Sequence, residues 1–327
     1  MPKHREPRAS SPPTTTVSPS SGARVPTEAP PLASARWLLG FVLAVCALAL
    51  VCVYAAICLL YWQGQWQFVF PPQQRSKQTA APSRQAAAPP HQDVGFDSTD
   101  TGALQLQGWW IPAAGAGAHS AGTILFLHGG AESLAQMGGE LQALHGLGVN
   151  VFAFDYRGFG KSEPLHPSEE SVAEDSDAAW LYLTGTRHIA PGSIVIYGRR
   201  LGAAIAAEAA LRHPRCAGMV LESAQPPLLD RLRSRGLNRF LPLSVIFHDR
   251  FDPSAALARS SVPKLFLSAT GEGSAGGSSS AAPLYFAGAA EPKTSVTLAS
   301  PKGIPPHSDP EYAAAIGRFL REHLSSE

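Results

Sequence analysis

The turn Gly198-Arg-Arg-Leu-Gly202 is the stretch of this sequence that bears most directly on chemistry. It follows a short apolar run and precedes a helix-forming run of small residues. Glycines at both ends let a strand turn sharply into a helix, because they lack a Cβ. Arg200 stands at the tip of this turn. Its guanidinium stays protonated and has no lone pair for attack, so it suits carboxylate or phosphate binding rather than nucleophilic catalysis.

Two further loops with polar residues follow apolar runs. Leu125-Phe-Leu-His-Gly-Gly-Ala131 contains glycines that let backbone N–H groups point into a site. His128 is interpreted as structural, because its turn supplies backbone donors rather than a base. In Asp155-Tyr-Arg-Gly-Phe-Gly-Lys-Ser162 we expect Asp155 and Arg157 to tie the loop together by hydrogen bonds.

Alternating strands and helices position these loops. Central runs such as 122–127 and 149–155 are apolar, which is typical of a parallel sheet covered by helices on both faces. The loops are therefore expected at the carboxyl edge of that sheet. Ser171-Val-Ala-Glu174 predicts a capping box in one helix. The predicted strands are 94–99, 103–111, 122–127, 149–155, 193–197, 217–222, 263–268 and 294–299.

The order and spacing of the three loops resemble the α/β-hydrolase fold. More narrowly, the chain is similar to the membrane-anchored α/β-hydrolases with one N-terminal helix, a group that includes serine thioesterases and esterases. The likeness spans about residues 60–325 and includes Val69-Phe-Pro-Pro72, Leu221-Glu-Ser223 and Asp249-Arg-Phe-Asp252. It implies a mostly parallel twisted sheet with helices on both faces, in which strand 103–111 runs antiparallel to the rest.

The resemblance also assigns positions to a catalytic triad. The family's nucleophile is the serine of G-x-S-x-G on a strained turn, and Arg200 occupies that position here. The acid position falls on Glu272, in a Gly/Ser/Ala-rich loop that makes a flexible mount; the alternative is a solvated carboxylate. The base position falls on His307; the alternative is an exposed loop histidine. Two of the three positions therefore depart from the family's pattern.

An oxyanion hole is a further feature that the resemblance implies. Its donors are the backbone N–H of Leu201 and that of Gly130 or Ala131. Backbone donors survive a change of side chain, so the hole is expected to persist. Asp252 is discounted as the acid because the proline after it is typical of a helix start. Ser223 is discounted because its setting predicts no sharp turn.

An apolar segment before the sheet predicts a membrane anchor. Residues 37–62 contain no charged side chain. A helix of this length spans roughly 39 Å, more than the roughly 30 Å of a hydrocarbon core. The alternative is a cleaved signal peptide, which would be shorter and followed by a small-residue cleavage site. We expect 1–36 to be a disordered tail, 63–92 a linker and 93–327 the α/β-hydrolase-like domain.

Basic residues beside this segment predict its orientation. More of them precede the segment than follow it in the linker, and an excess of Lys and Arg marks the cytoplasmic side. We therefore expect a single-pass membrane protein whose C-terminal domain lies on the non-cytoplasmic side. The basic residues are Lys3, Arg5, Arg8, Arg24 and Arg36 before it, and Arg75, Lys77 and Arg84 after it.

The composition of the chain limits which classes of partner and cofactor are expected. A net charge of +1 over 327 residues gives no support for a nucleic-acid partner. Three of the four cysteines fall inside the apolar segment, so no disulfide framework or zinc spacing can be drawn. We expect neither a metal nor another cofactor.

Three functional hypotheses fit these observations. The first is a membrane-anchored pseudoenzyme that has lost serine-hydrolase activity and binds a small anionic or acyl ligand. The second is an active hydrolase of acyl esters or thioesters, in which His307 is a general base for water. The third is an anchored structural domain with a blocked pocket. Ester hydrolysis distinguishes the second hypothesis from the others, and ligand-dependent thermal stabilisation distinguishes the first from the third.

Overall fold

The computed structural model describes residues 35–70, 88–98, 104–114, 122–234, 236–271, 280–301 and 303–324. The chain divides into two units, Met1–Tyr54 and Ala55–Glu327. The described part of the first unit belongs to helix α1 (Ala35–Gln63), whose last residues lie in the second unit. The predicted tail 1–36 lies outside the described residues except for its last two positions. Glu272, the expected acid, also lies outside them.

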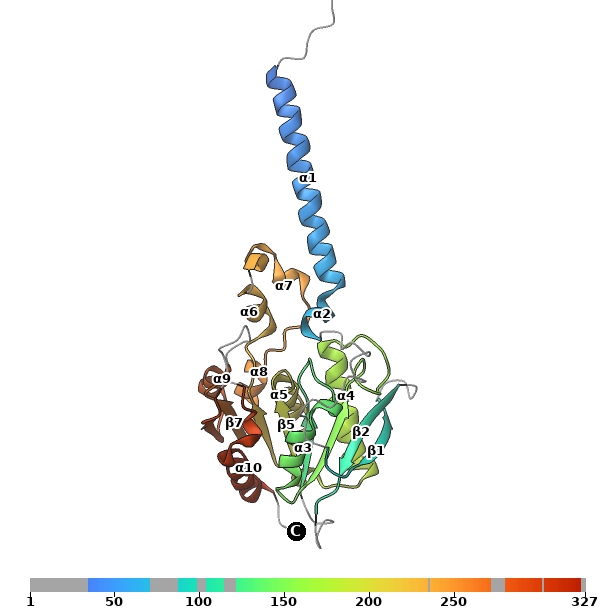
Figure 1. Cartoon of the computed structure of the whole chain (residues 1–327), viewed down its shortest axis with the longest axis vertical. Helices are drawn as coiled ribbons and strands as arrows, with labels where there is room; N and C mark the ends of the chain where they lie inside the picture. The colour runs from blue at the N-terminus through green and yellow to red at the C-terminus, as the bar shows by residue number, and fades with distance from the viewer. Residues whose placement is uncertain are drawn as a thin grey trace, which may run out of the picture. The chain divides into compact units, whose positions relative to one another are not determined.

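An eight-stranded sheet organises the second unit, in the order β1-β2-β4-β3-β5-β6-β7-β8 (Figure 1). Strand β2 is antiparallel to β1 and β4, whereas every pair from β4 to β8 is parallel. These findings confirm the predicted fold class and the antiparallel strand at 103–111. The strands are β1 (Gln92–Asp97), β2 (Gln105–Ile111), β3 (Thr123–Leu127), β4 (Asn150–Asp155), β5 (Ile194–Arg199), β6 (Gly218–Glu222), β7 (Lys264–Ala269) and β8 (Lys293–Leu298).

Helices cover both faces of this sheet. One apolar cluster joins the sheet to α4, α5, α6, α8 and α9, and the other joins it to α3 and α10. The helices are α2 (Gln65–Val69), α3 (Gly138–His145), α4 (Glu169–Leu181), α5 (Gly202–Arg212), α6 (Leu228–Arg233), α7 (Leu243–Ile246), α8 (Ser254–Arg259), α9 (Ala282–Gly288) and α10 (Pro310–His323).

The two apolar clusters follow from the two-residue period of a strand. Along β5, Ile194 and Ile196 belong to the α4–α5 cluster, whereas Val195 and Tyr197 belong to the α3–α10 cluster. Successive side chains of a strand point to opposite faces, so an apolar strand needs a helical layer on each side. Each fully buried aliphatic side chain contributes about 1.5–3 kcal/mol relative to exposure.

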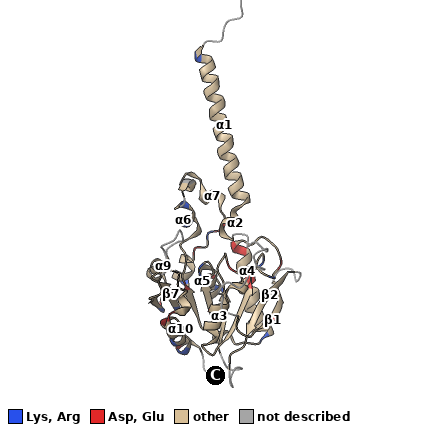
Figure 2. Ribbon diagram, in the orientation of Figure 1, with Lys and Arg blue, Asp and Glu red and all other residues tan. Residues whose placement is uncertain are grey.

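Helix α1 is long and apolar enough to cross a membrane, by its length and composition. None of its residues is buried. It carries no charged residue after Arg36, as Figure 2 shows.

The start of the predicted linker 63–92 is folded, which differs from the expectation. Helix α2 lies there, and Val69 and Phe70 are buried in the core. The Phe70 ring packs edge-on against Phe159 and Phe251, with ring centroids 5.7 and 5.6 Å apart. The Pro-, Ala- and Gln-rich composition that indicates a linker begins at about residue 71, whereas the aromatic residues before it gain stability by burial.

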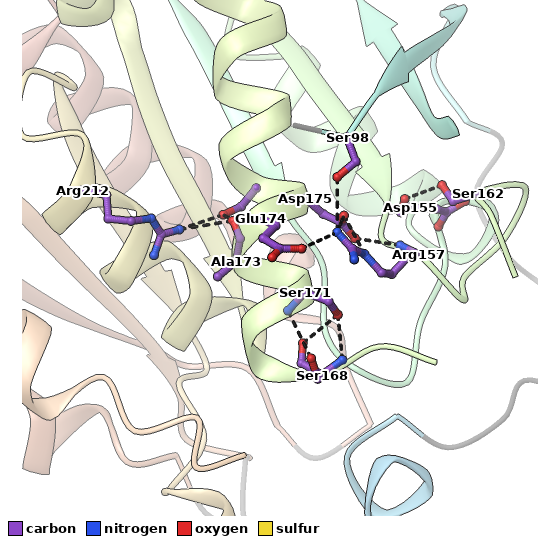
Figure 3. A network of polar contacts seen from close by, with 11 residues as sticks. Ser98, Asp155, Arg157, Ser162, Ser168, Ser171, Ala173, Glu174, Asp175 and Arg212 are labelled. Atoms are coloured by element: carbon purple, nitrogen blue, oxygen red, sulfur yellow. Dashed lines mark hydrogen bonds and ion pairs between the residues drawn. The ribbon is translucent and has the colours of Figure 1, made fainter. Parts of the chain in front are cut away.

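A polar network ties the loop after β4 to α4 (Figure 3). Arg157 donates to Asp175 from Nε, over 2.9 Å, and from a terminal nitrogen, over 2.6 Å. The same terminal nitrogen donates to Glu174 over 2.9 Å. Ser162 Oγ donates to the Asp155 carbonyl over 2.5 Å. The predicted role of Asp155 and Arg157 in holding this loop is thereby confirmed.

The capping box of α4 lies three residues earlier than predicted. Ser168 is the N-cap, and its Oγ accepts from Ser171 N over 3.2 Å. Ser171 Oγ accepts in turn from Ser168 N over 2.8 Å. A serine occupies the third helical position, where a Glu or Gln is usual. The usual pattern therefore pointed to Ser171 and Glu174 instead of Ser168 and Ser171.

Candidate active site

Arg200 lies at the tip of a sharp turn between β5 and α5. Its φ is 55°, in the left-handed region that bulky residues rarely adopt. A Cβ on Gly198 would lie 2.2 Å from the Gly202 carbonyl oxygen, and one on Gly202 would lie 2.1 Å from the Leu127 carbonyl oxygen. Both distances are too short for any side chain. The two glycines therefore allow α5 to approach β3 and β5 closely.

The tip lies between the turn after β3 and the end of β6. Arg200 N donates to the Glu222 carbonyl over 2.8 Å, which extends the β5–β6 pairing. On the other side, a Cβ on Gly129 would lie 3.5 Å from Arg200 Cβ. The Arg200 side chain is exposed and forms no ion pair with any residue in the described part of the chain. It is therefore an available cation at the carboxyl edge of the sheet.

Two oxyanion candidates lie against each other beside this tip. A Cβ on Gly130 would lie 2.6 Å from Leu201 Cδ2 and 2.8 Å from the Val69 carbonyl oxygen. Leu201 precedes the first turn of α5, where backbone N–H groups have no partner within the helix. Ala131, the third candidate, follows Gly130 and is exposed. The segment after α1 thus closes one side of the turn that carries these donors.

Arg199 has the opposite environment to Arg200, because it is the last residue of β5 and lies among carboxyl groups, whereas Arg200 lies in the exposed turn that follows. One terminal nitrogen of Arg199 lies 2.5 Å from Glu132 Oε2. Its Nε contacts Glu140 Oε1 on α3 and lies 3.6 Å from Glu222 Oε1. Three carboxyl groups therefore surround this guanidinium, and we call the four residues the Arg199 cluster.

Burial changes the titration of the Arg199 cluster. Burial and the nearby Glu222 raise the pKa of Glu140 to about 8, although Arg199 opposes the change. Burial alone would lower the pKa of Arg199, but its carboxyl neighbours outweigh burial and raise it. Tyr197 donates to Glu222 over 2.5 Å, and its hydroxyl lies 2.8 Å from that of Tyr312. Burial raises the pKa of both tyrosines, so both remain neutral donors.

His307 lies in the turn η6 (Pro306–Ser308), close enough to Arg199 for this cation to affect the pKa of the histidine. Its ring is half-buried, and its buried Nδ1 has no hydrogen-bond partner among the described residues. Burial lowers the pKa of His307, and Arg199 lowers it further. A triad base instead has a carboxylate that stabilises its protonated form. Glu272, at the acid position, lies outside the described residues.

His128 is buried behind the turn after β3. Its Nδ1 lies 2.7 Å from the Gly129 carbonyl oxygen, and its Nε2 lies 3.8 Å from Asp155 Oδ1. Burial lowers the pKa of His128. Asp155 Oδ1 also accepts from Leu134 N over 2.9 Å. These contacts join the loops after β3 and β4, in keeping with a structural histidine.

Comparisons with known proteins agree with the fold described above. Residues 118–266 match the family described as Serine aminopeptidase, S33. A Mycobacterium tuberculosis protein named Uncharacterized protein Rv2307c is 31% identical over 283 residues, which cover 83% of this chain and 92% of that protein. The solved structure of an alpha-beta hydrolase from Vibrio vulnificus has a TM-score of 0.56 at 20% identity, covering 80% of this chain and 91% of that one.

The chain belongs to the α/β-hydrolase superfamily. A shorter match supports this assignment: Alpha/beta hydrolase domain-containing protein 17C of Mus musculus is 37% identical over 112 residues, 34% of this chain and 33% of that protein. Enzymes with this fold carry their nucleophilic serine on a sharp strand-to-helix turn flanked by glycines. In this member the turn keeps its two glycines and carries Arg200 at its tip.

Ser223 has a backbone conformation that the sequence did not indicate. Its φ is 53°, and it follows β6 directly. Arg199 pairs with Glu222 in the sheet, so Ser223 is the neighbour of Arg200 at the same edge. Its side chain is buried. A serine in a left-handed turn beside the position expected for the nucleophile is therefore the first residue to control for in labelling experiments.

The Arg199 cluster was missed at the level of sequence, although one signal was present. Glu222 ends the apolar run Met219–Leu221 and is 1% exposed. A carboxyl group on a buried strand needs a partner, and Arg199 ends the adjacent strand. Glu132 and Glu140 gave no comparable signal, because neither interrupts or ends a continuous apolar run.

A cavity of 270 Å³ lies between β2 and the loops after β3 and β4. Trp109, Asp155 and Lys161 are among its lining residues, whereas Arg200 and His307 are not. It is therefore separate from the Arg200 tip. Within the described ranges, no three His, Cys, Asp or Glu side chains are arranged to hold a metal ion.

Proposed function

We propose that this α/β-hydrolase superfamily member is a membrane-anchored protein without serine-hydrolase activity, which binds an anionic acyl ligand at the Arg200 tip. The observation that carries the proposal is Arg200 itself, at the tip of the β5–α5 turn with a φ of 55°. Covalent catalysis needs a deprotonatable oxygen beside a base, and a guanidinium offers none. Loss of the nucleophile removes about 10⁶-fold of the rate in a well-studied protease.

The surroundings of His307 give a second argument for lost catalysis. A triad histidine takes a proton from the nucleophile, and a carboxylate stabilises the imidazolium that forms. The charged group that acts on His307 in the described part of the chain is the cation Arg199, which lowers its pKa. A cation disfavours the imidazolium, so restoring the serine alone does not restore an efficient base.

Anion binding follows from the contrast between the two neighbouring arginines. Three carboxyl groups surround Arg199, whereas Arg200 is exposed and has no ion pair with a described residue. Beside Arg200 lie Gly129, which precedes the oxyanion candidate Gly130, and the start of α5. A guanidinium next to backbone N–H donors suits a carboxylate or phosphate oxygen. A fatty-acid carboxylate has this chemistry and is also acyl.

An alternative function is ester or thioester hydrolysis by water. The lowered pKa of His307 favours a neutral imidazole, which is able to accept a proton from water. This route lacks a covalent intermediate and is expected to be slow. It predicts ester turnover that survives Arg200→Ala and disappears in His307→Ala, whereas the principal proposal predicts no turnover in any of these proteins.

The membrane part of the proposal depends on α1. Its length and composition fit a membrane span, and more basic residues precede the apolar run 37–62 than follow it in the linker 63–92. We propose an uncleaved anchor with the C-terminal domain on the non-cytoplasmic side. Intact-mass measurement of the membrane fraction tests the anchor, because a cleaved signal peptide leaves a shorter chain. Protease protection in oriented vesicles tests the side.

Labelling with a fluorophosphonate probe tests the loss of the nucleophile. We expect no adduct on the unmodified full chain and slow labelling of Arg200→Ser, with feeble ester turnover because His307 is poorly supported. Arg200→Ala is the matched control and should not label. Stoichiometric labelling of the unmodified chain would contradict the proposal. If that labelling disappeared in Ser223→Ala, the nucleophile would have moved to the neighbouring strand.

Thermal stabilisation tests the ligand class. Hexanoate and hexyl phosphate should raise the melting temperature of the full chain in nanodiscs, whereas hexanol should not, because binding to the folded state stabilises it. Arg200→Gln should abolish the effect. Arg212→Gln is the control, since Arg212 lies at the other end of α5 and pairs with Asp177. Equal stabilisation of both variants would mean that the anion binds elsewhere.

A further inference from the structure

The connection between β6 and β7 carries exposed apolar side chains. It includes η5 (Gly236–Phe240) and α7. Phe240 is 62% exposed and Val245 is 76% exposed. Single exposed apolar residues are common on protein surfaces. Phe240 and Val245 are informative because the connection that carries them contacts the end of the apolar helix α1.

The η5–α7 segment is fixed to the last turn of α1. Tyr61 Oη donates to Asn238 Oδ1 over 3.0 Å, and its ring meets that of Phe247 edge-on with centroids 6.5 Å apart. Just after α7, His248 N donates to Oε1 of Gln65, which follows α1, over 3.2 Å. All of these residues belong to the second unit of the chain. The last turn of α1 and the residues just after it therefore adjoin the η5–α7 segment.

The end of α1 is itself exposed and apolar. Leu60 is 68% exposed and Trp62 is 49% exposed. The apolar run 37–62 spans roughly 39 Å, which exceeds a hydrocarbon core of roughly 30 Å by more than the depth of one headgroup layer. Its last turn therefore falls at the level of the headgroups, where tyrosine and tryptophan rings are favoured.

The charge of the neighbouring sequence suits a lipid surface. Residues 228–247 contain four arginines and one aspartate. The Arg233 side chain is 53% exposed, and a terminal nitrogen lies 3.5 Å from Asp230 Oδ1 in an exposed ion pair. Basic residues together with exposed apolar ones are the composition of segments that lie in a membrane interface.

We propose that Leu60, Trp62, Phe240 and Val245 form a single lipid-docking patch, which seats the η5–α7 segment in the headgroup layer of an anionic bilayer. This proposal rests on the proposed membrane anchor and goes beyond it, since an anchor alone leaves the second unit free above the surface. Docking buries Phe240 and Val245 to a depth of about 5–10 Å. Docking thereby holds the η5–α7 segment, which follows β6 and Ser223 in the chain, against the lipid.

Depth-dependent quenching tests the docking. The full chain is prepared with its four native cysteines replaced by serine or alanine, and a single cysteine is labelled with the fluorophore NBD. Val245→Cys reports the patch. Leu284→Cys on α9 is the matched control, because Leu284 is an apolar residue that is 66% exposed. Val51→Cys in α1 reports the anchor. The proteins are reconstituted in vesicles of phosphatidylcholine and phosphatidylglycerol that contain lipids brominated near the headgroup or near the chain end.

Docking predicts a distinct result at each position. NBD at 245 should lose emission with headgroup-proximal bromines and lose less with chain-end bromines, NBD at 51 should be quenched by the deeper bromines, and NBD at 284 should be unaffected. If 51 is quenched while 245 behaves like 284, docking is wrong and the anchor stands. If 51 is not quenched, the anchor fails and docking fails with it. If 245 is shielded from aqueous iodide but insensitive to brominated lipids, a protein covers the patch and lipid docking is wrong.

Discussion

Replacing Glu140 with glutamine tests the electrostatics of the Arg199 cluster. Glu140 is 3% exposed, and its pKa in the folded protein is about 8, against an ordinary value of 4.5. Between pH 4.5 and pH 8, Glu140 in the folded state therefore holds a proton that it has released in the unfolded state. Stability from this group is therefore fully present below pH 4.5 and is lost as the pH rises through 8.

The size of the effect follows from linkage. One proton difference changes the free energy of unfolding by about 1.4 kcal/mol per pH unit within that window. Glutamine has the shape of the protonated acid and does not titrate. Glu140→Gln should therefore match the wild type near pH 4.5 and exceed its stability by a few kcal/mol near pH 8, although it removes a carboxyl group beside Arg199.

Urea unfolding of the full chain in non-ionic detergent, followed by tryptophan fluorescence from pH 5 to 9, measures this difference. Glu322→Gln is the control, because Glu322 is exposed on α10. Other buried carboxyl groups also add to the slope of the wild type, so the difference between the two proteins isolates Glu140. Parallel curves for wild type and Glu140→Gln from pH 5 to 8 would refute the reasoning, as would a variant that is less stable at pH 8.

Two further substitutions test the packing around the site. Gly198→Ala should destabilise the protein by about 3 kcal/mol, because its Cβ would meet the Gly202 carbonyl oxygen at 2.2 Å; Gly288→Ala, with no atom within 4 Å of the new Cβ, should change stability by less than about 1 kcal/mol in the same urea titration. Tyr312→Phe removes a hydroxyl 2.8 Å from that of Tyr197 and should lower the free energy of unfolding by about 1–3 kcal/mol; an unchanged urea midpoint would show that this hydroxyl pair adds nothing.

The sheet could be predicted from the sequence because its signals are local. Each strand is a short apolar run between turn-forming residues, and the centre of the sheet is apolar throughout because helices cover both faces. The direction of β2 came from family resemblance rather than from its own residues. The burial of Phe70 could not be seen, because its partners Phe159 and Phe251 are remote in sequence.

The tight turn that carries Arg200 was predictable from the sequence, but the charges around it were not. The glycine spacing located Arg200 at a tight turn. The surroundings of Arg199 depend on Glu132, Glu140 and Glu222, which come from a loop, a helix and a strand. No spacing rule links such residues, because only the folded sheet brings them together. The positive φ of Ser223 is likewise set by the fold, since serine has no preference for it.

The glycines and the tip of the β5–α5 turn carry different information. Gly198 and Gly202 contact the backbone of α5 and β3, so the close packing of the helix on the sheet requires them whether or not the turn supports catalysis. Their presence indicates the fold. The residue at the tip faces solvent and contributes little to that packing, so serine and Arg200 are both compatible with the scaffold. The chemistry of this α/β-hydrolase member must therefore be inferred from Arg200 and the charges around His307, because the motif that surrounds them is fully explained by packing.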